Sequence, residues 1–157
     1  MQAEFTITAI MTDILENIRK ELQEASDEKT RLSGLRFFRE EVRLYGIKTN
    51  TVSDIAKQYW AQIKGLSKED ILVMCVSLWQ SGMMEESFIA CSWSEKLGTR
   101  LIPSDFTVLE NWVRNYVTNW ASCDTLCNHT VGDFIQKYPE YLGKLKEWAR
   151  SDNRWVK

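Results

Sequence analysis

The sequence has few of the residues that interrupt regular structure, with only two prolines and seven glycines among 157 residues. Nearly all of them stand where a helix is expected to begin or end, so no linker or low-complexity segment divides the chain. A chain of this length with 44% hydrophobic and 27% charged residues is sufficient for one domain with a sizeable core. We therefore expect a single domain over residues 1–157.

Cysteine and histidine are also scarce, with four cysteines and one histidine. The cysteines form no CxxC pair and mostly fall on apolar helix faces, which indicates free buried thiols. Cys123, Cys127 and His129 have the spacing C-x3-C-x-H, which lacks the second ligand pair of ordinary zinc sites, so we expect no metal. With one histidine and no Gly-rich phosphate loop, the sequence does not indicate a Ser-His-Asp hydrolase or a P-loop enzyme.

Long apolar runs are missing as well, since no stretch of about 18 apolar residues is present to span a bilayer. The first ten residues carry Glu4 in place of the positive charge with which a secretory signal begins. These two features favour a cytoplasmic protein without a membrane partner.

Neither sign of charge dominates, since the net charge is −2. This balance argues against a surface covered in positive charge for binding nucleic acid. The distribution is nevertheless uneven. Residues 31–66 carry seven basic and three acidic groups, residues 136–157 carry six and three, and residues 67–135 carry four and nine. The two basic segments are either ordinary solvated helix faces or two strips that approach the same polyanion.

The sequence shows strong helical periodicity, because apolar residues recur three and four positions apart along nearly the whole chain. Ser67 with Asp70 three residues later predicts one helix start, and Pro103 with Ser104 predicts another. The pattern predicts about eight helices in an all-α fold of stacked antiparallel pairs, either a HEAT-like or ARM-type α-solenoid or a compact bundle. Clear stripes are Met11, Ile14, Leu15, Ile18 and Leu22; Val52, Ile55, Ala56, Tyr59, Trp60 and Ile63; Ile71, Met74, Cys75, Leu78 and Trp79; Phe106, Leu109, Trp112, Val113 and Tyr116.

The seven tryptophans are unusually many, and most of them fit an apolar stripe, but Trp120 differs. Trp120 stands in the polar stretch 118–124, whereas Trp60, Trp79, Trp112 and Trp148 need no explanation beyond packing. Asp124 follows four residues later, which places a carboxylate one helical turn from the indole. Two interpretations stay open at this point: Asp124 is an acid in the first turn of a helix, favoured by the helix dipole, or the Trp-x-x-x-Asp unit is a functional site.

Three segments carry a resemblance to a known family: Tyr45-Gly46-Ile47-Lys48-Thr49 before a helix, Leu78-Trp79 at the end of one, and Asn119-Trp120-Ala121-Ser122-Cys123-Asp124. They resemble the AlkD-type DNA alkylation repair glycosylases, and the similarity spans nearly the whole chain. The resemblance implies a HEAT-like solenoid that hydrolyses the N-glycosidic bond of cationic N3- and N7-alkylated purines. It further implies double-stranded DNA as the partner and no metal or organic cofactor, and we expect the protein to be a monomer.

The resemblance also assigns roles to individual residues. Asp124 corresponds to the catalytic aspartate, and Trp120 to an aromatic wall beside the deoxyribose of the damaged nucleotide. The chemistry suits them, because a carboxylate stabilises an oxocarbenium-like sugar and an aromatic face attracts a cationic base. Lys48, Thr49 and Asn50 precede a helix whose free N–H groups are able to hold a phosphate, although a plain capped turn explains them equally well.

The end of the chain departs from the family pattern, since relatives continue for roughly two further helical repeats. We therefore expect these residues to form the N-terminal portion of a longer architecture, in which Arg154 and Lys157 add positive charge for DNA. Two other functions are kept as hypotheses: a non-catalytic DNA-binding relative, and a helical scaffold for another protein.

Overall fold

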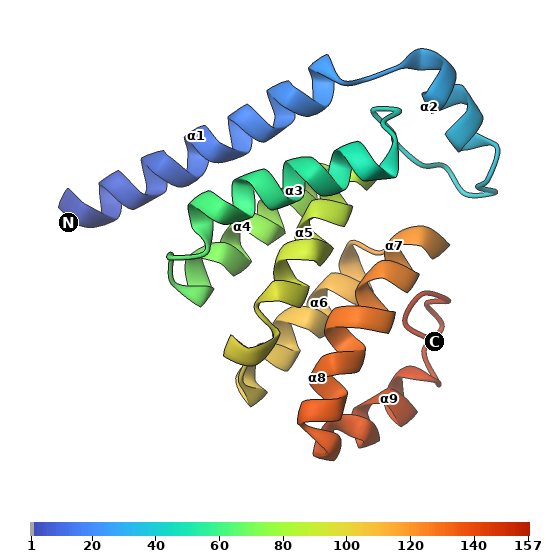
Figure 1. Ribbon diagram of the computed structural model, residues 1–157. Coiled ribbons are helices and arrows are strands. Elements are labelled where there is room, and N and C mark those ends of the chain that lie inside the picture. Colours follow the sequence, from blue (N-terminus) through green and yellow to red (C-terminus); the bar gives the residue numbers. More distant parts are fainter. Residues whose placement is uncertain (1) are drawn as a thin grey trace.

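The computed structural model describes residues 2–157, and Figure 1 shows how their helices are arranged. Within this range there is no β-strand, and the only pairing of extended backbone is an isolated bridge between Arg43 and Met83. The predicted all-α class is therefore confirmed. The α-helices are α1 (Gln2–Glu24), α2 (Glu28–Leu35), α3 (Thr49–Ile63), α4 (Lys68–Gln80), α5 (Met84–Lys96), α6 (Phe106–Asn115), α7 (Trp120–Thr125), α8 (Gly132–Lys137) and α9 (Leu142–Trp148).

Short helical segments connect several of these helices. The 3-10 turns are η1 (Gly98–Arg100), η2 (Pro103–Asp105) and η4 (Pro139–Tyr141), and a stretch of π-helix, η3 (Leu126–Val131), joins α7 directly to α8. Counting the joined α7 and α8 once gives eight helices in residues 2–157, which agrees in number with the prediction of about eight, although α2 was not among the helices predicted.

The helices stack in the order of the sequence (Figure 1). α1 and α3 lie at one end, α4 and α5 follow, then α6 beside the joined α7 and α8, and α9 lies at the other end. Neighbouring helices pack on one another, α4 on α5, α3 on α5 and α1 on α3. This succession of packed helical pairs is the arrangement of a HEAT-like fold.

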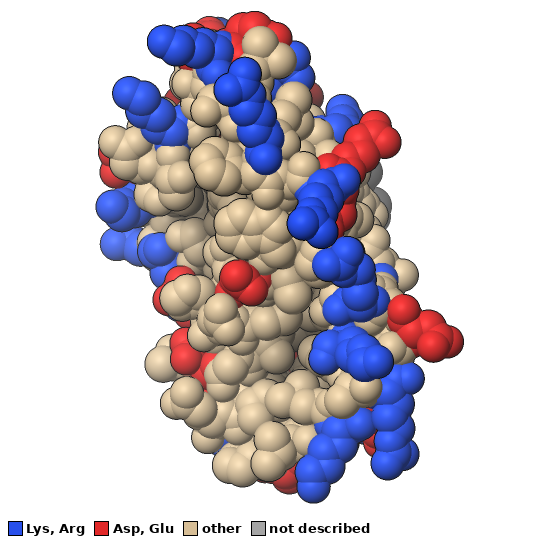
Figure 2. Space-filling view, turned by 90° about the vertical axis from the view of Figure 1, so that its right-hand side faces the viewer, with Lys and Arg blue, Asp and Glu red and all other residues tan. Residues whose placement is uncertain are grey.

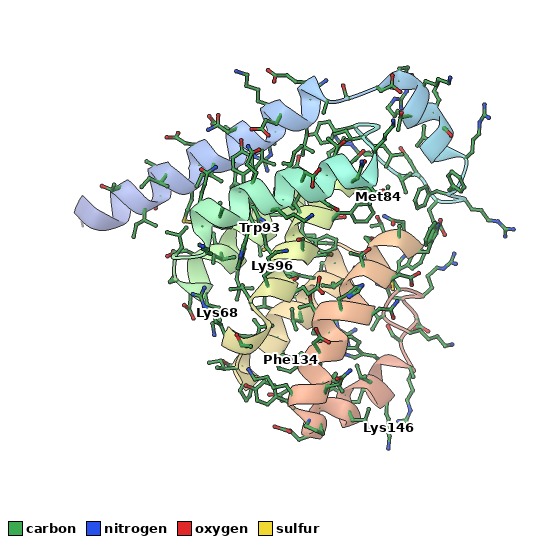
Figure 3. All side chains as sticks on the ribbon, in the orientation of Figure 1. Lys68, Met84, Trp93, Lys96, Phe134 and Lys146 are labelled. Atoms are coloured by element: carbon green, nitrogen blue, oxygen red, sulfur yellow. The ribbon has the colours of Figure 1, made fainter. Side chains whose placement is uncertain are left out.

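The core runs through the middle of the stack and is built from the predicted apolar stripes. Ile18, Ile63, Leu78 and Trp112 have no exposed surface. Trp93 of α5 is equally buried, and its indole N–H donates to the carbonyl oxygen of Ala56 on α3 at 3.0 Å, which ties the two helices together (Figure 3). Burying an indole in this way contributes a large share of core stability.

Two helix starts show how local sequence fixes the helix bounds. Ser67 is the N-cap of α4, as predicted, and its side chain accepts a hydrogen bond from the backbone N–H of Asp70. The sequence did not predict α2, which begins at an Asp27 cap whose carboxylate accepts from Thr30 N at 2.7 Å. α2 has no buried residue, so it lacks the apolar stripe by which helices are recognised in a sequence.

The helices found in residues 2–157 are too short or too polar for a bilayer crossing, so none is a candidate membrane span.

Candidate functional site

A cleft of about 440 Å³ opens where α3, α5 and α7 meet. The structure thus brings together Thr49, Trp120 and Asp124, which belong to two distant segments of the sequence. Figure 2 shows the side of the molecule on which α2 and the start of α7 lie: uncharged surface runs down its middle, acidic groups lie within it, and lysines and arginines gather along its edges. The residues lining the cleft are Thr49, Val52, Ser53, Ala56, Phe88, Ser92, Glu95, Trp120, Ala121, Asp124, Thr125 and His129.

Asp124 contributes an unpaired carboxylate to this cleft. The buried Asn119 is the N-cap of α7, since its side-chain oxygen accepts from the N–H of Ser122 at 2.9 Å, and the helix begins at Trp120. Asp124 is the fifth residue of α7, and the first turn holds no acid. The interpretation of Asp124 as a first-turn acid is therefore wrong. Its side chain is exposed and forms no hydrogen bond or ion pair with any residue in the described part of the chain.

The Trp120 side chain is fixed by contacts with the loop after α2, yet much of its ring remains accessible. Its indole N–H donates to the carbonyl oxygen of Phe37 at 3.3 Å, and its ring stacks on Phe38 with 5.5 Å between centroids and 21° between planes. It still exposes 46% of its surface, which confirms that it is not a core residue. Since the residues that orient the ring come from the loop after α2, the aromatic surface in the cleft depends on a segment 83 positions away.

The start of α3 forms another part of the cleft. Lys48 is the N-cap of α3 but makes no side-chain capping hydrogen bond, so N–H groups in the first turn lack a side-chain partner. Lys48, Thr49 and Asn50 are all exposed, and Thr49 lines the cleft. This arrangement is compatible with an anion at the end of a 15-residue helix, where the dipole favours negative charge.

The turn that precedes α3 is fixed by a buried carboxylate from α5. Glu85 is 3% exposed and accepts from the backbone N–H groups of Tyr45, Gly46 and Ile47 at 3.1, 2.9 and 3.3 Å. Gly46 has φ of 85°, and a Cβ there would lie 2.5 Å from the Cβ of Arg31. Only glycine fits this position, which explains the Tyr-Gly-Ile-Lys-Thr motif in physical terms.

Glu95 and His129 also line the cleft, and the sequence interpretation did not assign either to it. Glu95 Oε1 lies 3.6 Å from His129 Nδ1. His129 follows Asp124 by five residues, a spacing that turns away from a shared face in an α-helix. The π-helical η3 intervenes, and its wider turn allows Trp120, Asp124 and His129 to line one cleft at spacings of four and five.

Arg154 and Lys157 lie elsewhere. The Arg154 guanidinium pairs with Glu40 Oε1 at 3.3 Å and covers the ring of Trp155 at 4.6 Å from its centroid. Lys157 lines a second, mostly apolar pocket of about 390 Å³ that also contains Cys123 and Trp148. Neither residue lines the Asp124 cleft, although the ion pair to Glu40 places Arg154 against the loop that holds Trp120.

The cysteines next to this region differ in their acidity. A hydrogen bond with Cys127 lowers the pKa of Cys123 to about 7, against partial burial and the charge of Asp124, which raise it. The pKa of Cys127 is raised by the same hydrogen bond and by burial. Among the side chains that the structure describes, there is no group of three or more His, Cys, Asp or Glu able to hold a metal ion.

Comparison with known proteins adds one match and one negative result. The family model described as DNA alkylation repair enzyme matches residues 18–157, which include every residue that lines the cleft. No curated protein matches the chain.

Proposed function

Because the chain belongs to the DNA alkylation repair enzyme family, we propose that it hydrolyses the N-glycosidic bond of cationic N3- and N7-alkylated purines in double-stranded DNA. The observation that carries this proposal is the cleft in which the unpaired carboxylate of Asp124 lies with the accessible ring of Trp120.

Asp124 supplies negative charge where the reaction develops positive charge. Loss of the purine leaves an oxocarbenium-like sugar, which a nearby carboxylate stabilises electrostatically while it orients the attacking water. A carboxylate already committed to an ion pair would be less available for this task, and Asp124 has no such partner in the described part of the chain. A cationic alkylpurine is a good leaving group, so a second carboxylate acting as a general acid is not required.

The rest of the cleft favours a cationic nucleotide. Trp120 offers an aromatic surface, whose attraction to a cation is worth roughly 0.5 to 2 kcal/mol. Glu95 adds an exposed carboxylate to the same cleft. Both features act more strongly on a positively charged base than on a neutral one, so they would select the lesion over the normal purine.

Positive groups around the cleft would hold the DNA backbone. The start of α3, with Lys48, Thr49 and Asn50, offers backbone N–H groups and a lysine to one phosphate beside the cleft. Arg154 and Lys157, both exposed, add charge near the end of the described chain. These contacts fix the position of the duplex and carry no sequence information, as suits an enzyme that finds a lesion in any sequence.

The test is release of free base from duplex DNA that contains N7-methylguanine, measured at single turnover for the wild type and for Asp124→Asn. We expect Asp124→Asn to lower the release rate at least about 100-fold, because the residue stabilises the charge formed in the transition state. The matched control is Asp133→Asn, which removes another exposed carboxylate, on α8, outside the cleft. Circular dichroism confirms that each variant folds.

Undiminished release by Asp124→Asn would contradict the proposed role of this residue. A folded wild type that releases no base but binds DNA with a steep salt dependence would favour the non-catalytic DNA-binding relative. A folded wild type without measurable DNA affinity would favour the protein scaffold.

A further inference from the structure

The loop after α2 exposes an aromatic side chain, Phe37, that takes no part in the packing of the core. Phe37 exposes 73% of its surface, the largest exposed fraction among the large hydrophobic residues in the described part of the chain. Among the described side chains it forms no ring contact, and it does not belong to the core or pack against it. An isolated exposed apolar residue is common on protein surfaces, so its surroundings decide whether it has a role.

Those surroundings are basic and adjoin the cleft. Arg36 and Arg39 stand on either side of the Phe37-Phe38 pair, are exposed, and form no ion pair or hydrogen bond through their side chains in the described chain. We refer to residues 36–40 as the rim segment. Its backbone carbonyl at Phe37 accepts the Trp120 indole N–H, and the Phe38 ring stacks on Trp120.

The rim segment is held in place from several directions, so Phe37 is presented on a defined backbone. The N–H groups of Arg36, Phe37 and Phe38 donate to the carbonyls at the end of α2 at 3.3, 3.1 and 3.2 Å. At its other end, Glu40 pairs with Arg154 at 3.3 Å. A side chain with two rotatable bonds on a fixed turn loses little conformational entropy when it binds a ligand.

Resting on the proposed function, we infer that the rim segment is a second DNA contact, in which Phe37 stacks on a base exposed beside the lesion. Arg36 and Arg39 bind phosphates of the same stretch of DNA. The exposed aromatic between unpaired guanidinium groups provides a stacking surface and backbone charge together, which is how proteins bind unstacked nucleotides regardless of sequence. The connection through Trp120 places this contact next to the damaged nucleotide.

The experiment measures fluorescence anisotropy of a labelled duplex that contains a tetrahydrofuran abasic site, where the opposite base is free to leave the stack. The variants are Phe37→Leu, which keeps an apolar side chain without a ring, and Phe37→Trp, which keeps an aromatic one. We expect Phe37→Leu to weaken binding about tenfold and Phe37→Trp to bind like the wild type, since stacking depends on the ring. The unmodified duplex should respond less, because its bases remain paired.

The control is Leu32→Ala, which shortens another exposed apolar side chain, on α2, without touching the rim segment. A double variant, Arg36→Gln with Arg39→Gln, should lower the slope of log affinity against log salt by about 2, as two lost phosphate contacts require. Equal affinities for Phe37→Leu and Phe37→Trp, or an unchanged salt slope, would overturn the inference.

A parallel assay of base release separates this inference from the proposed function. A wild type that releases no base but depends on the Phe37 ring for binding abasic DNA supports the rim contact and contradicts the glycosylase. A wild type that releases base with Phe37→Leu unaffected in both assays supports the glycosylase and overturns the rim contact.

Discussion

The middle of the stack and the cleft use tryptophan in opposite ways. Trp93 has no exposed surface, and Trp120 exposes 46%, although the indole N–H of each donates to a backbone carbonyl, at 3.0 and 3.3 Å. In both places the hydrogen bond fixes the orientation of the ring. Only in the cleft does part of the ring remain accessible, so an anchored edge serves packing in one region and, in the function we propose, recognition in the other.

The largest expected effect comes from breaking the core tryptophan. Trp93→Ala should lower the free energy of unfolding by about 3 to 5 kcal/mol, because it leaves a cavity between α3 and α5 and removes the hydrogen bond to the Ala56 carbonyl. Trp120→Ala should cost about 1 kcal/mol or less, since much of that ring is already in water. Urea denaturation followed by circular dichroism measures both. Equal losses for the two variants would mean that the cleft tryptophan is also a packing residue.

A smaller loss should follow from the carboxylate that connects the core to the cleft. Glu85→Gln replaces an acceptor oxygen by an NH2 group that faces backbone N–H groups of residues 45–47, and should cost about 1 to 3 kcal/mol. The matched control is Glu95→Gln on the same helix, where the carboxylate is exposed and the stability should hardly change. Thermal unfolding measures the difference. A control as unstable as Glu85→Gln would show that the buried hydrogen bonds are not the cause.

The expected effect of the cleft tryptophan is on activity. Trp120→Leu keeps an apolar side chain without a π face and should slow release of N7-methylguanine about 2- to 30-fold, corresponding to the roughly 0.5 to 2 kcal/mol of a cation–π contact. Trp120→Phe should be affected less, because it keeps a ring but loses the N–H that donates to Phe37. Single-turnover rates compare them. Faster release by Trp120→Leu than by Trp120→Phe would exclude the aromatic face as the source of the effect.

The sequence was sufficient for the fold wherever burial follows the helical period. Ile18, Leu78 and Trp112 were predicted in the core from spacing alone, and all are fully buried. α2 was missed because it buries no residue, and its start depends on the Asp27 cap. Trp93 was not assigned to a stripe because α5 buries polar residues as well, among them Glu85, and so shows little amphipathic contrast.

The site could be predicted only in part, for a geometric reason. Trp120 and Asp124 have ordinary α-helical spacing, so the sequence paired them, and both line the cleft. The position of His129 in the cleft was not predicted, because the π-helical η3 changes the angular spacing between residues and a fixed period of 3.6 does not describe it. The contacts of Trp120 with Phe37 and Phe38 were not predicted either, because these residues lie in a loop about 83 positions earlier and no local sequence pattern encodes such a contact.

The smallest expected effect is the influence of the Asp124 charge on the pKa of the neighbouring Cys123 thiol. The hydrogen bond between Cys123 and Cys127 lowers the pKa of Cys123 to about 7, so Cys123 should react with iodoacetamide in a pH-dependent manner with a midpoint near 7. Burial raises the pKa of Cys75 and Cys91, so those thiols should react slowly. Peptide mass spectrometry after timed quenching gives the rate for each thiol.

The charge of Asp124 raises the pKa of Cys123, so removing it has a definite sign. Asp124→Asn should lower that pKa, increase the thiolate fraction below pH 7 and speed alkylation of Cys123 at pH 6, whereas above pH 8 the thiol is already ionised and the effect should vanish. Asp133→Asn should leave the profile of Cys123 unchanged, because the charge of Asp133 is not among the influences on this thiol. A Cys123 profile that does not respond to Asp124→Asn would contradict the expected influence of this carboxylate on the neighbouring thiol.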